Sequence, residues 1–441
     1  MKKLIPLMLV LLLVACNLFQ TNVQITLTPT ISSITLTTTT LPATTVPPTD
    51  TPAPSETALP TDIPLSTPTL AAPTANPQPA APPHFKVGEA IILSTIHMAS
   101  TTEGWGMSGP YILVTRDGAQ TWRETTPPEP FPDGVKVEAY GAFPDAQTAW
   151  VIYSQNSQIS PGASVWHTSD GGQTWTASPP LVHSAYGDAV WAEFASLDAR
   201  TGWLAIRGAW AGAGSHFDAQ LFRTTDGGAT WTALTAPDAV DVVFDDYTGM
   251  VFTDGQTGWL AWQHLGAYMS WPASYAVTAD GGSTWISHDL PAPPDAPNLF
   301  DEYWYCNPYQ TNLLTATSVR LLVVCTGGDL PDIGYLYGTE NGGATWQTHA
   351  LPVVPKMDQG DELIFLDPNN GYLLGQKIYH TTDGGLTWTS ITTVAWDHMQ
   401  FDLISQQVGW AIVSIGDLPS ALVMTGNGGK TWQEIKPVVG P

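Results

Sequence analysis

Short apolar or alternating runs, separated by glycine-containing polar turns, fill the chain from residue 85 to its end. The runs at 111–114 (Tyr-Ile-Leu-Val) and 421–424 (Ala-Leu-Val-Met) have the length and composition typical of strands. Each run is followed by a polar octet and then by another short run. The pattern predicts a succession of strand hairpins in which the octets are the connecting turns.

The octets are seven near-copies of one pattern. Each begins with Thr, has Asp or Asn at its third place and Gly at its fourth, and closes on Thr-Trp. The third-place side chain accepts hydrogen bonds from the backbone of its own turn, and Gly supplies the positive φ that a tight hairpin needs. The closing Trp offers a large ring to bury between neighbouring sheets. We interpret the octets as structural turns, with third-place residues Asp117, Asp170, Asp226, Asp280, Asn341, Asp383 and Asn427.

A second signal, Gly or Ala followed by an aromatic residue, precedes six of the seven octets. These pairs are Gly104-Trp105, Ala149-Trp150, Gly202-Trp203, Gly258-Trp259, Gly371-Tyr372 and Gly409-Trp410. The fifth unit has Ser318-Val319-Arg320-Leu321 in that place. Each unit has material for about four strands, which is the content of one propeller blade. The sequence therefore predicts an all-β fold: a single seven-bladed β-propeller with four-stranded antiparallel blades.

Two segments of different composition precede the repeats. Residues 1–16 have a basic start, an apolar run too short to span a bilayer, and Leu-Val-Ala-Cys at 13–16, which resembles a bacterial lipobox. We expect a lipoprotein signal peptide, lipidation of Cys16 and an extracytoplasmic, membrane-anchored protein; the alternative is an ordinary signal peptide with an incidental cysteine. Residues 17–84 are dominated by Thr, Pro, Ala and Ser and are expected to form a disordered tether. Residues 85–441 are assigned to the propeller.

Charge and composition exclude several classes of partner. The formal net charge is −25, from 39 acidic and 14 basic residues, and this sign repels nucleic-acid phosphates. We expect no nucleic-acid partner and a monomeric protein. The ten His residues lack metal-ligand spacing, and no nucleotide-binding or metalloprotease motif is present, so we expect no cofactor and no metal. A charged share of only 12% favours short strands over helices, and we expect almost no helix.

The two cysteines outside the signal segment are Cys306 and Cys325. They flank 313–319, where we place the bend of a strand hairpin, so the two sulfurs would lie opposite each other. An exported compartment permits a disulfide, but spacing alone does not distinguish it from two separate buried thiols. Both interpretations stand at this point.

The octet resembles the Asp-box (BNR) repeat, Ser/Thr-x-Asp-x-Gly-x-Thr-Trp, of sialidases, two-propeller xyloglucanases, sortilin-type receptors and photosystem II assembly factors. The first copy departs from it at Ala119, where Gly is expected. The Gly-Trp signature and the single set of seven repeats make residues 85–436 look most like the photosystem II assembly factors. The resemblance implies the fold, whereas activity has to be argued from the site residues.

The functional residues of these families are not evident here. Resemblance to a sialidase implies an arginine triad with an Arg-Ile-Pro element ahead of the first repeat, but no arginine precedes Arg116. Arg116, Arg123 and Arg223 lie in or beside octets, on the wrong rim for such a site. The xyloglucanase cleft lies between two propellers, and one is missing here. The basic patch of the assembly factors has no evident counterpart in this acidic chain.

Inserted loops mark a candidate binding face. Octet turns occupy the bottom rim of a blade, whereas second-to-third-strand loops and blade-to-blade connections reach the top face. The insertions fall in those top loops, where aromatic residues beside carboxylates suit sugar rings or a peptide. The alternative is that the aromatics only fill the loops and the central channel. The candidate ligand-binding residues are Asp188, Trp191, Trp210, Trp271, Asp301, Trp304 and Trp396.

Three functions fit these patterns. The leading hypothesis is a surface-tethered, non-catalytic recognition or scaffold module that binds a glycan or a protein. The second is a carbohydrate-active glycoside hydrolase that uses carboxylates of the top face. The third is an assembly factor for a membrane protein complex.

Overall fold

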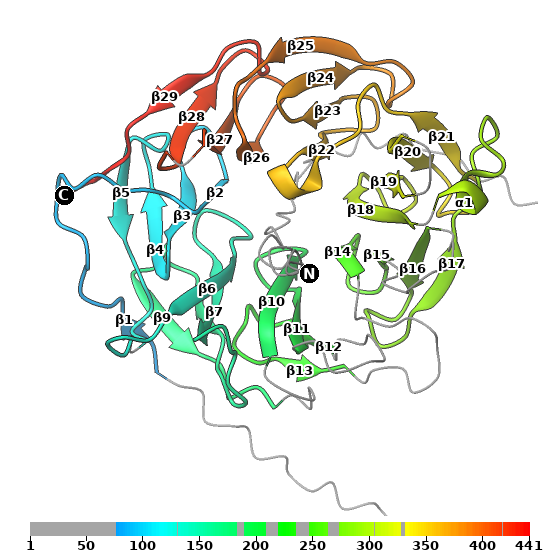
Figure 1. Ribbon diagram of the computed structural model, residues 1–441. Helices are drawn as coiled ribbons and strands as arrows, with labels where there is room; N and C mark the ends of the chain where they lie inside the picture. Colours follow the sequence, from blue (N-terminus) through cyan, green and yellow to red (C-terminus); the bar gives the residue numbers. More distant parts are fainter. Residues whose placement is uncertain are drawn as a thin grey trace, which may run out of the picture. The chain divides into compact units, whose positions relative to one another are not determined.

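The computed structural model describes residues 76–129, 131–182, 189–208, 219–234, 247–262, 273–303, 305–327, 331–416 and 418–441. Within these residues, seven antiparallel sheets follow one another around a central axis and form the blades of a β-propeller (Figure 1). Helical structure in the described residues is limited to α1 (Leu299–Glu302) and the single 3-10 turn η1 (Met357–Gln359). The predicted fold class is confirmed.

Each blade consists of four consecutive strands, numbered outward from the axis. Blade 1 contains β2 (Thr95–Met98), β3 (Gly104–Ser108), β4 (Tyr111–Thr115) and β5 (Thr121–Glu124). Blade 2 contains β6 (Val137–Ala142), β7 (Ala149–Gln155), β8 (Trp166–Thr168) and β9 (Thr174–Ala177). Blade 3 contains β10 (Ala189–Ser196), β11 (Gly202–Gly208), β12 (Ala219–Thr224) and β13 (Thr232–Ala233). Blade 4 contains β14 (Tyr247–Phe252), β15 (Gly258–Trp262), β16 (Ser274–Thr278) and β17 (Ile286–Asp289).

The remaining three blades repeat this order. Blade 5 contains β18 (Tyr305–Leu313), β19 (Val319–Thr326), β20 (Ile333–Thr339) and β21 (Gln347–Ala350). Blade 6 contains β22 (Glu362–Phe365), β23 (Gly371–Leu374), β24 (Lys377–Thr381) and β25 (Thr389–Thr393). Blade 7 contains β26 (His398–Leu403), β27 (Gly409–Ser414), β28 (Ala421–Thr425) and β29 (Gln433–Ile435).

Every Asp-box forms the turn between the third and fourth strands of its blade, as predicted. In blade 4, Asp280 accepts hydrogen bonds from the Thr278 hydroxyl (2.8 Å), the Thr284 amide (2.8 Å) and the Thr284 hydroxyl (2.6 Å). Burial opposes ionisation of Asp280, but the hydrogen bonds outweigh it and lower its pKa. Gly281 and Gly282 adopt φ values of 73° and 93°, in the left-handed region that favours glycine. The box therefore satisfies its own polar groups.

Asn replaces Asp in two boxes because its amide nitrogen takes over the contact with the second Thr hydroxyl. In blade 5, the oxygen of Asn341 accepts from the Thr345 amide (2.9 Å) and the Thr339 hydroxyl (3.0 Å). The nitrogen of Asn341 donates to the Thr345 hydroxyl (2.9 Å), which reverses the direction of that hydrogen bond. The irregular first box also keeps its geometry, with Ala119 at a φ of 71°.

The boxes also receive contacts from the preceding blade. The indole nitrogens of Trp150 and Trp203 donate to Gly227 and Gly281 carbonyls in the boxes of blades 3 and 4, both at 2.8 Å. In blade 5, Arg320 occupies the position of the aromatic residue. Its guanidinium donates to the Pro368 carbonyl of blade 6 (3.3 Å) and is itself buried. A cation therefore makes the interblade contact in the one unit that lacks the aromatic signature.

The core lies between adjacent blades, where the faces of two sheets meet. Between blades 2 and 3, for example, Trp150 and Ile152 pack with Leu204, Ile206 and Phe222. Trp105, Trp150, Trp203, Trp259 and Trp410 are among the largest side chains that are fully buried. Removal of such rings from water is the main stabilising term where the faces of neighbouring sheets meet.

The two ends of the described chain close the ring. β30 (Val438–Val439) adds to the outer edge of blade 1, parallel to β5, and β1 (Gln78–Pro79) adds to the outer edge of blade 2. The segment 86–91 between them binds the C-terminal tail through Gly88 N–H to Val439 O (2.8 Å) and Ile91 N–H to Pro437 O (3.0 Å). Each blade keeps its own four strands, and 85–92 supplies no swapped strand. We call residues 76–93 the strap.

A buried carboxylate anchors the strap. Glu124 on β5 accepts hydrogen bonds from the amides of His84 (2.6 Å) and Phe85 (3.1 Å), and the His84 ring stacks on Tyr111 at 4.3 Å between centroids. The ordered contacts begin before residue 85, where we placed the domain boundary. The repeat pattern contains no signal for the strap because the strap belongs to no blade.

Candidate binding face

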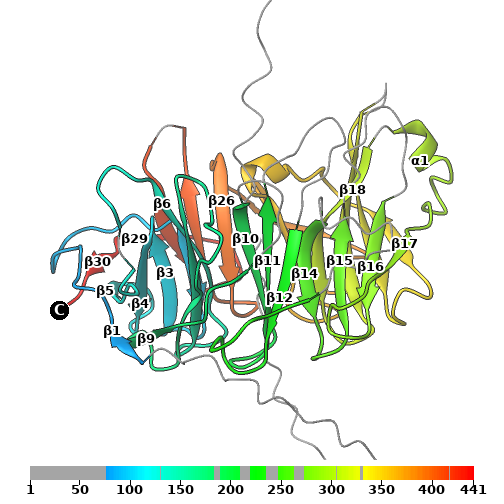
Figure 2. The same ribbon diagram turned by 90° about the horizontal axis from the view of Figure 1, so that it is seen from below.

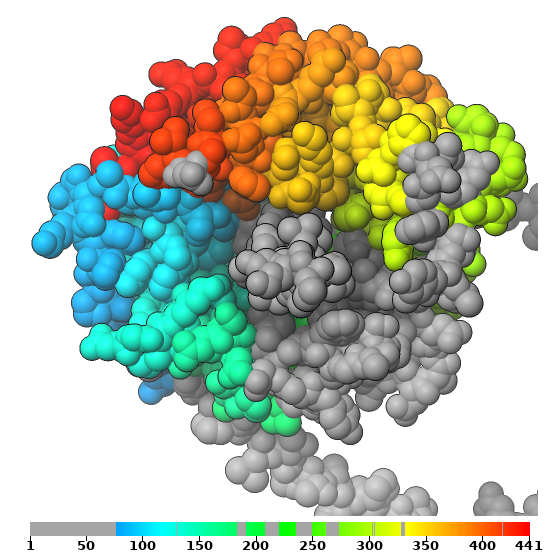
Figure 3. All heavy atoms as spheres, viewed as in Figure 1, coloured from blue at the N-terminus to red at the C-terminus, as the bar shows by residue number. Residues whose placement is uncertain are grey.

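The two rims of the ring differ in what they carry. The box turns and the first-to-second-strand turns lie on one side, here called the box rim, while α1, in the connection from blade 4 to blade 5, lies on the opposite top face (Figure 2). Box amides bind the turn beside them in the same blade, as in Gly281 N–H to Gln256 O (2.7 Å). In the space-filling view, the segment containing η1, coloured gold, borders the centre of the ring (Figure 3). Because the box amides are already bound to neighbouring turns, we expect a ligand site on the top face and not at the box rim.

Several candidate residues lie outside the described residues, and their prediction stays untested. They are Cys16, Asp188, Trp210, Trp271 and Trp304. Of the others, Asp301 is exposed on α1, as a ligand-binding carboxylate requires. Trp191 is half-buried on β10, and Trp396 lies in the connection between blades 6 and 7. The structure does not bring these three residues into one cluster of contacts.

Trp396 corrects one of our expectations. Its side chain is 8% exposed and packs edge-on against Trp432, at 5.5 Å between ring centroids, and beside Phe401. The ring therefore belongs to the core of blade 7 and presents no stacking surface to a ligand. The sequence pattern, an aromatic residue beside an acidic one in a connecting segment, does not distinguish a core ring from an exposed one.

Trp191 is paired with a cation. It lies opposite Arg207 on the neighbouring strand β11, and the Arg207 guanidinium sits 4.6 Å from the centroid of its ring. A guanidinium over an indole is a favourable cation–π contact. The pair presents a half-buried cation and ring at the top ends of two strands of blade 3.

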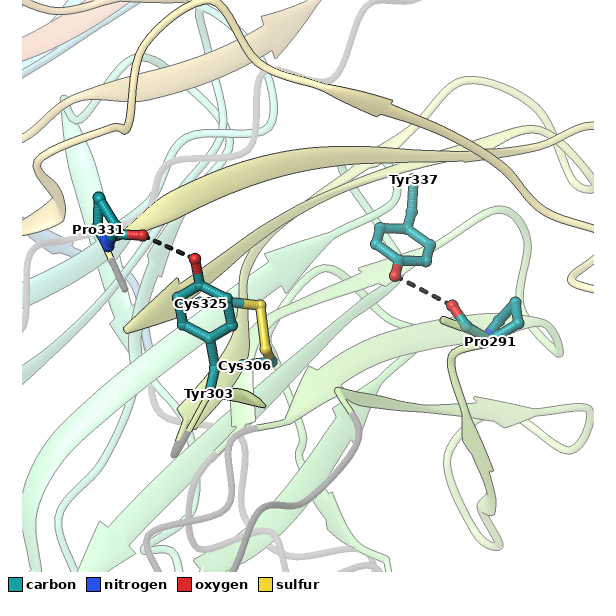
Figure 4. Close-up of a disulfide and its surroundings, with 6 residues drawn as sticks. All are labelled: Pro291, Tyr303, Cys306, Cys325, Pro331 and Tyr337. Atoms are coloured by element: carbon teal, nitrogen blue, oxygen red, sulfur yellow. Dashed lines mark hydrogen bonds between the residues drawn. A yellow bond between two sulfur atoms is a disulfide. The ribbon is translucent and has the colours of Figure 1, made fainter. Parts of the chain in front are cut away.

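The connection from blade 4 to blade 5 forms an ordered ledge on the top face, which we define as residues 290–303. The Tyr337 hydroxyl donates to the Pro291 carbonyl (3.0 Å) at its start, and the Tyr303 hydroxyl donates to Pro331 (2.7 Å) at its end (Figure 4). Leu299 and Tyr303 are buried against the blade. The tyrosines of this region therefore support the ledge from below.

A disulfide fixes the strands beneath the ledge. Cys306 and Cys325 are bonded and face each other across β18 and β19, which resolves the two alternatives left open by the sequence (Figure 4). The expected hairpin bend at 313–319 is confirmed by the ends of these strands. The ledge thus rests on a hairpin whose upper end is covalently closed.

The ledge belongs to an acidic sector of the chain. Asp295 and Asp301 are exposed on it, and Asp332 is exposed on the neighbouring loop. Between Arg223 and Arg320 the sequence has eleven Asp and Glu residues and no Lys or Arg. A local field of this sign attracts cationic groups and repels anions.

The inner strands contain charged residues that the sequence analysis did not single out. Desolvation raises the pKa of Glu362 on β22 to about 8 and that of Asp402 on β26 to about 7. Both carboxylates accept backbone amides of the next blade: Phe401 N–H at 3.3 Å and Met98 N–H at 2.5 Å. Perturbed carboxyls often mark active sites, but these two are engaged in contacts between blades.

No metal site or membrane-spanning helix occurs in the described part of the chain. No group of three His, Cys, Asp or Glu side chains there is arranged to hold a metal ion. No helix in those residues is long and apolar enough to cross a bilayer.

The fold and the seven turns define the class of protein: the chain contains a seven-bladed Asp-box β-propeller. Residues 340–437, from the box of blade 5 through blades 6 and 7, match the family described as Photosynthesis system II assembly factor YCF48. The match agrees with the resemblance inferred from the repeats.

Comparison with solved structures gives matches at low identity. A structure of YCF48 bound to D1 peptide is 19% identical with a TM-score of 0.46, and the match covers 79% of this chain and 98% of that one. YCF48 from Cyanidioschyzon merolae is 15% identical with a TM-score of 0.45, covering 81% and 100%. The GH74 xyloglucanase from Xanthomonas campestris is 14% identical with a TM-score of 0.48, covering 82% and 56%. No curated protein matches the chain.

Proposed function

We propose that this protein is an extracytoplasmic, lipid-anchored propeller that recognises a partner on its top face without catalysing a reaction. The observation that carries the proposal is the unequal use of the two rims. The box rim is committed to turns and interblade contacts, whereas the ledge, which lies above the disulfide, is on the top face. Variable loops on a rigid scaffold are a common arrangement for binding sites.

The place where the chain joins the propeller supports this orientation. β1 pairs with the start of β9, directly after the box of blade 2, and so lies at the box rim (Figure 2). A tether that joins the propeller there leaves the top face free. Cys16 and the part of the Thr- and Pro-rich segment that precedes the strap supply the anchor and the tether in this proposal.

A protein partner with basic groups fits the described top face better than a glycan does. The rings of Tyr303, Tyr337 and Trp396 are buried and offer no platform for a sugar. The ledge is acidic and lies in a sector without Lys or Arg, so it complements a cationic segment. The match of 340–437 to an assembly-factor family favours a scaffold for a membrane protein complex over a free receptor.

The test is a binding screen of the full chain against a peptide array with graded Lys and Arg content and against a glycan array. Two variants locate any binding: Asn298→Arg on the exposed ledge and Thr382→Arg on the exposed box rim of blade 6. Each adds one positive charge at an exposed site. We expect saturable binding to basic peptides that weakens by at least about tenfold in Asn298→Arg, falls with salt, and is unchanged in Thr382→Arg.

Other outcomes separate the alternatives. Glycan binding that is lost in Asn298→Arg would keep the recognition function and replace the protein partner with a carbohydrate. Release of new reducing ends from a polysaccharide would establish the hydrolase and overturn the proposal. Binding that is lost only in Thr382→Arg would contradict the assignment of the top face.

A further inference from the structure

Neighbouring inner strands are joined around the axis by side chains that reach the backbone amides of the next blade. Gln310 of blade 5 accepts from the Leu363 amide of blade 6 (2.6 Å), and Glu362 of blade 6 accepts from the Phe401 amide of blade 7 (3.3 Å). Amides on the free edge of an inner strand have no partner strand, so these side chains satisfy them. In each contact, a side-chain oxygen on the inner strand of one blade accepts a hydrogen bond from a backbone amide of the next blade. The acceptor is an amide oxygen in Gln310 and a carboxylate in Glu362.

The same rule holds where the ring closes. Asp402 of blade 7 accepts from the Met98 amide of blade 1 at 2.5 Å, and the two residues are 304 positions apart in the chain. At this junction the chain crosses only at the outer edge, where the C-terminal residues run from β29 of blade 7 to β30 beside β5, so the inner strands β26 and β2 meet through side chains. Asp402 is 3% exposed, and its second oxygen lies 4.0 Å from Nδ1 of His97. We call the contacts of Glu362 and Asp402 the closing latch.

We propose that the closing latch is controlled by protons: it holds blades 6, 7 and 1 most tightly in mild acid and loosens as Glu362 and Asp402 ionise. Three titratable groups influence the carboxylates of the closing latch. Asp361, beside Glu362 on the same blade, and Asp402 raise the pKa of Glu362 through like charge. His97 is the imidazole that faces Asp402 from β2.

The direction follows from the protonation states. Desolvation raises the pKa of Glu362 and Asp402 to about 8 and about 7, from ordinary values of 4.5 and 3.8, and so outweighs the hydrogen bonds from the Phe401 and Met98 amides, which by themselves favour the ionised form. A carboxyl with a raised folded-state pKa stabilises the fold fully below its unfolded value, and this stability is lost as the pH rises through the folded value. Burial lowers the pKa of His97 to about 4, so a neutral imidazole faces the carboxylate over this range and supplies no countercharge. The latch therefore weakens as the pH rises from about 4 to about 8.

Hydrogen exchange of the full chain tests the proposal. Peptides covering β2 and β26 report the Met98 and Phe401 amides, and their rates are corrected for the intrinsic pH dependence of exchange. We expect protection of these peptides to fall by at least about tenfold from pH 6 to pH 9. In the double variant Glu362→Gln and Asp402→Asn, whose amide oxygens still accept the hydrogen bonds, this loss should shrink to less than about twofold.

A matched gain-of-function variant keeps the test independent of how the double variant folds. Gln310 of blade 5 is buried, accepts from the Leu363 amide at 2.6 Å and has no ionisable group. Gln310→Glu should therefore introduce a pH-dependent loss of protection at the Leu363 amide, at the junction of blades 5 and 6. The proposal is overturned if wild-type protection at β2 and β26 does not change with pH. It is also overturned if the double variant keeps the wild-type dependence.

Discussion

The box rim and the top face of this propeller are built in opposite ways from the same seven units. At the box rim, each turn repeats the same contacts: a third-place side chain binds its own Thr residues, and a box carbonyl or amide binds a neighbour. On the top face, the ledge has supports of its own: two tyrosine hydroxyls bind its flanks, and a disulfide closes the hairpin beneath it. We therefore expect the contacts that repeat in every blade to stabilise the fold, and the connections outside the repeat to provide the surface for binding.

Two tryptophans of blade 3 give the largest expected contrast between the regions. Trp203 at the box rim is fully buried, stacks on Phe252 and donates to the Gly281 carbonyl. We expect Trp203→Ala to lower the free energy of unfolding by about 3–5 kcal/mol, because it leaves a cavity and an unpaired carbonyl. Trp191→Ala on the half-buried top side should cost about 1 kcal/mol. Guanidinium denaturation measures the free energy of unfolding of both variants. Equal losses would contradict the difference expected between the box rim and the top face.

Removal of the disulfide should have the next largest effect. Cys306 and Cys325 close a loop with a sequence separation of 19 residues, so Cys306→Ala with Cys325→Ala should lower the free energy of unfolding by about 3 kcal/mol. The variant should also be cleaved by protease within the ledge before the blades unfold. Cleavage that begins at the box turns would show that the ledge does not depend on the disulfide.

The box carboxylate should follow. Asp280→Ala removes the acceptor of three hydrogen bonds and should cost about 2 kcal/mol. Asp280→Asn should cost less than about 0.5 kcal/mol, because Asn341 shows how an amide makes the same contacts. Thermal unfolding of the two variants distinguishes them. A large loss in Asp280→Asn would mean that the charge, and not the hydrogen-bond pattern, stabilises the turn.

The exposed carboxylate of the ledge should have the smallest effect on stability. The Asp301 side chain is exposed, so Asp301→Ala should alter the free energy of unfolding by less than about 0.5 kcal/mol. Its effect should appear only in binding of a basic peptide. A substantial loss of stability would place Asp301 among the supports of the ledge.

The blades were predictable because their determinants are local. The octet contains its own hydrogen-bonding partners within five consecutive positions, as the contacts from Thr278 to Gly282 show, so a sequence repeat reports it directly. The Gly-aromatic signal likewise located the second strands. The exchange of an aromatic residue for Arg320 was visible, but its interblade contact was not, because Pro368 lies 48 residues away.

The contacts that close the ring were not predictable from the sequence. Asp402 meets Met98 across 304 residues, and Glu124 meets His84 across 40 residues without a recurring motif. At the candidate site, the ligand-binding role of the exposed Asp301 stays a prediction, whereas Trp396 was placed on the surface although it is buried. A single aromatic residue in a connection lacks the periodicity that reveals burial in a strand.

Hydrogen exchange of the full chain with and without a bound basic peptide tests the central claim most directly. The account predicts that binding protects peptides from the top connections, above all those covering the ledge, and leaves the box turns unchanged. Protection confined to the box turns would contradict it.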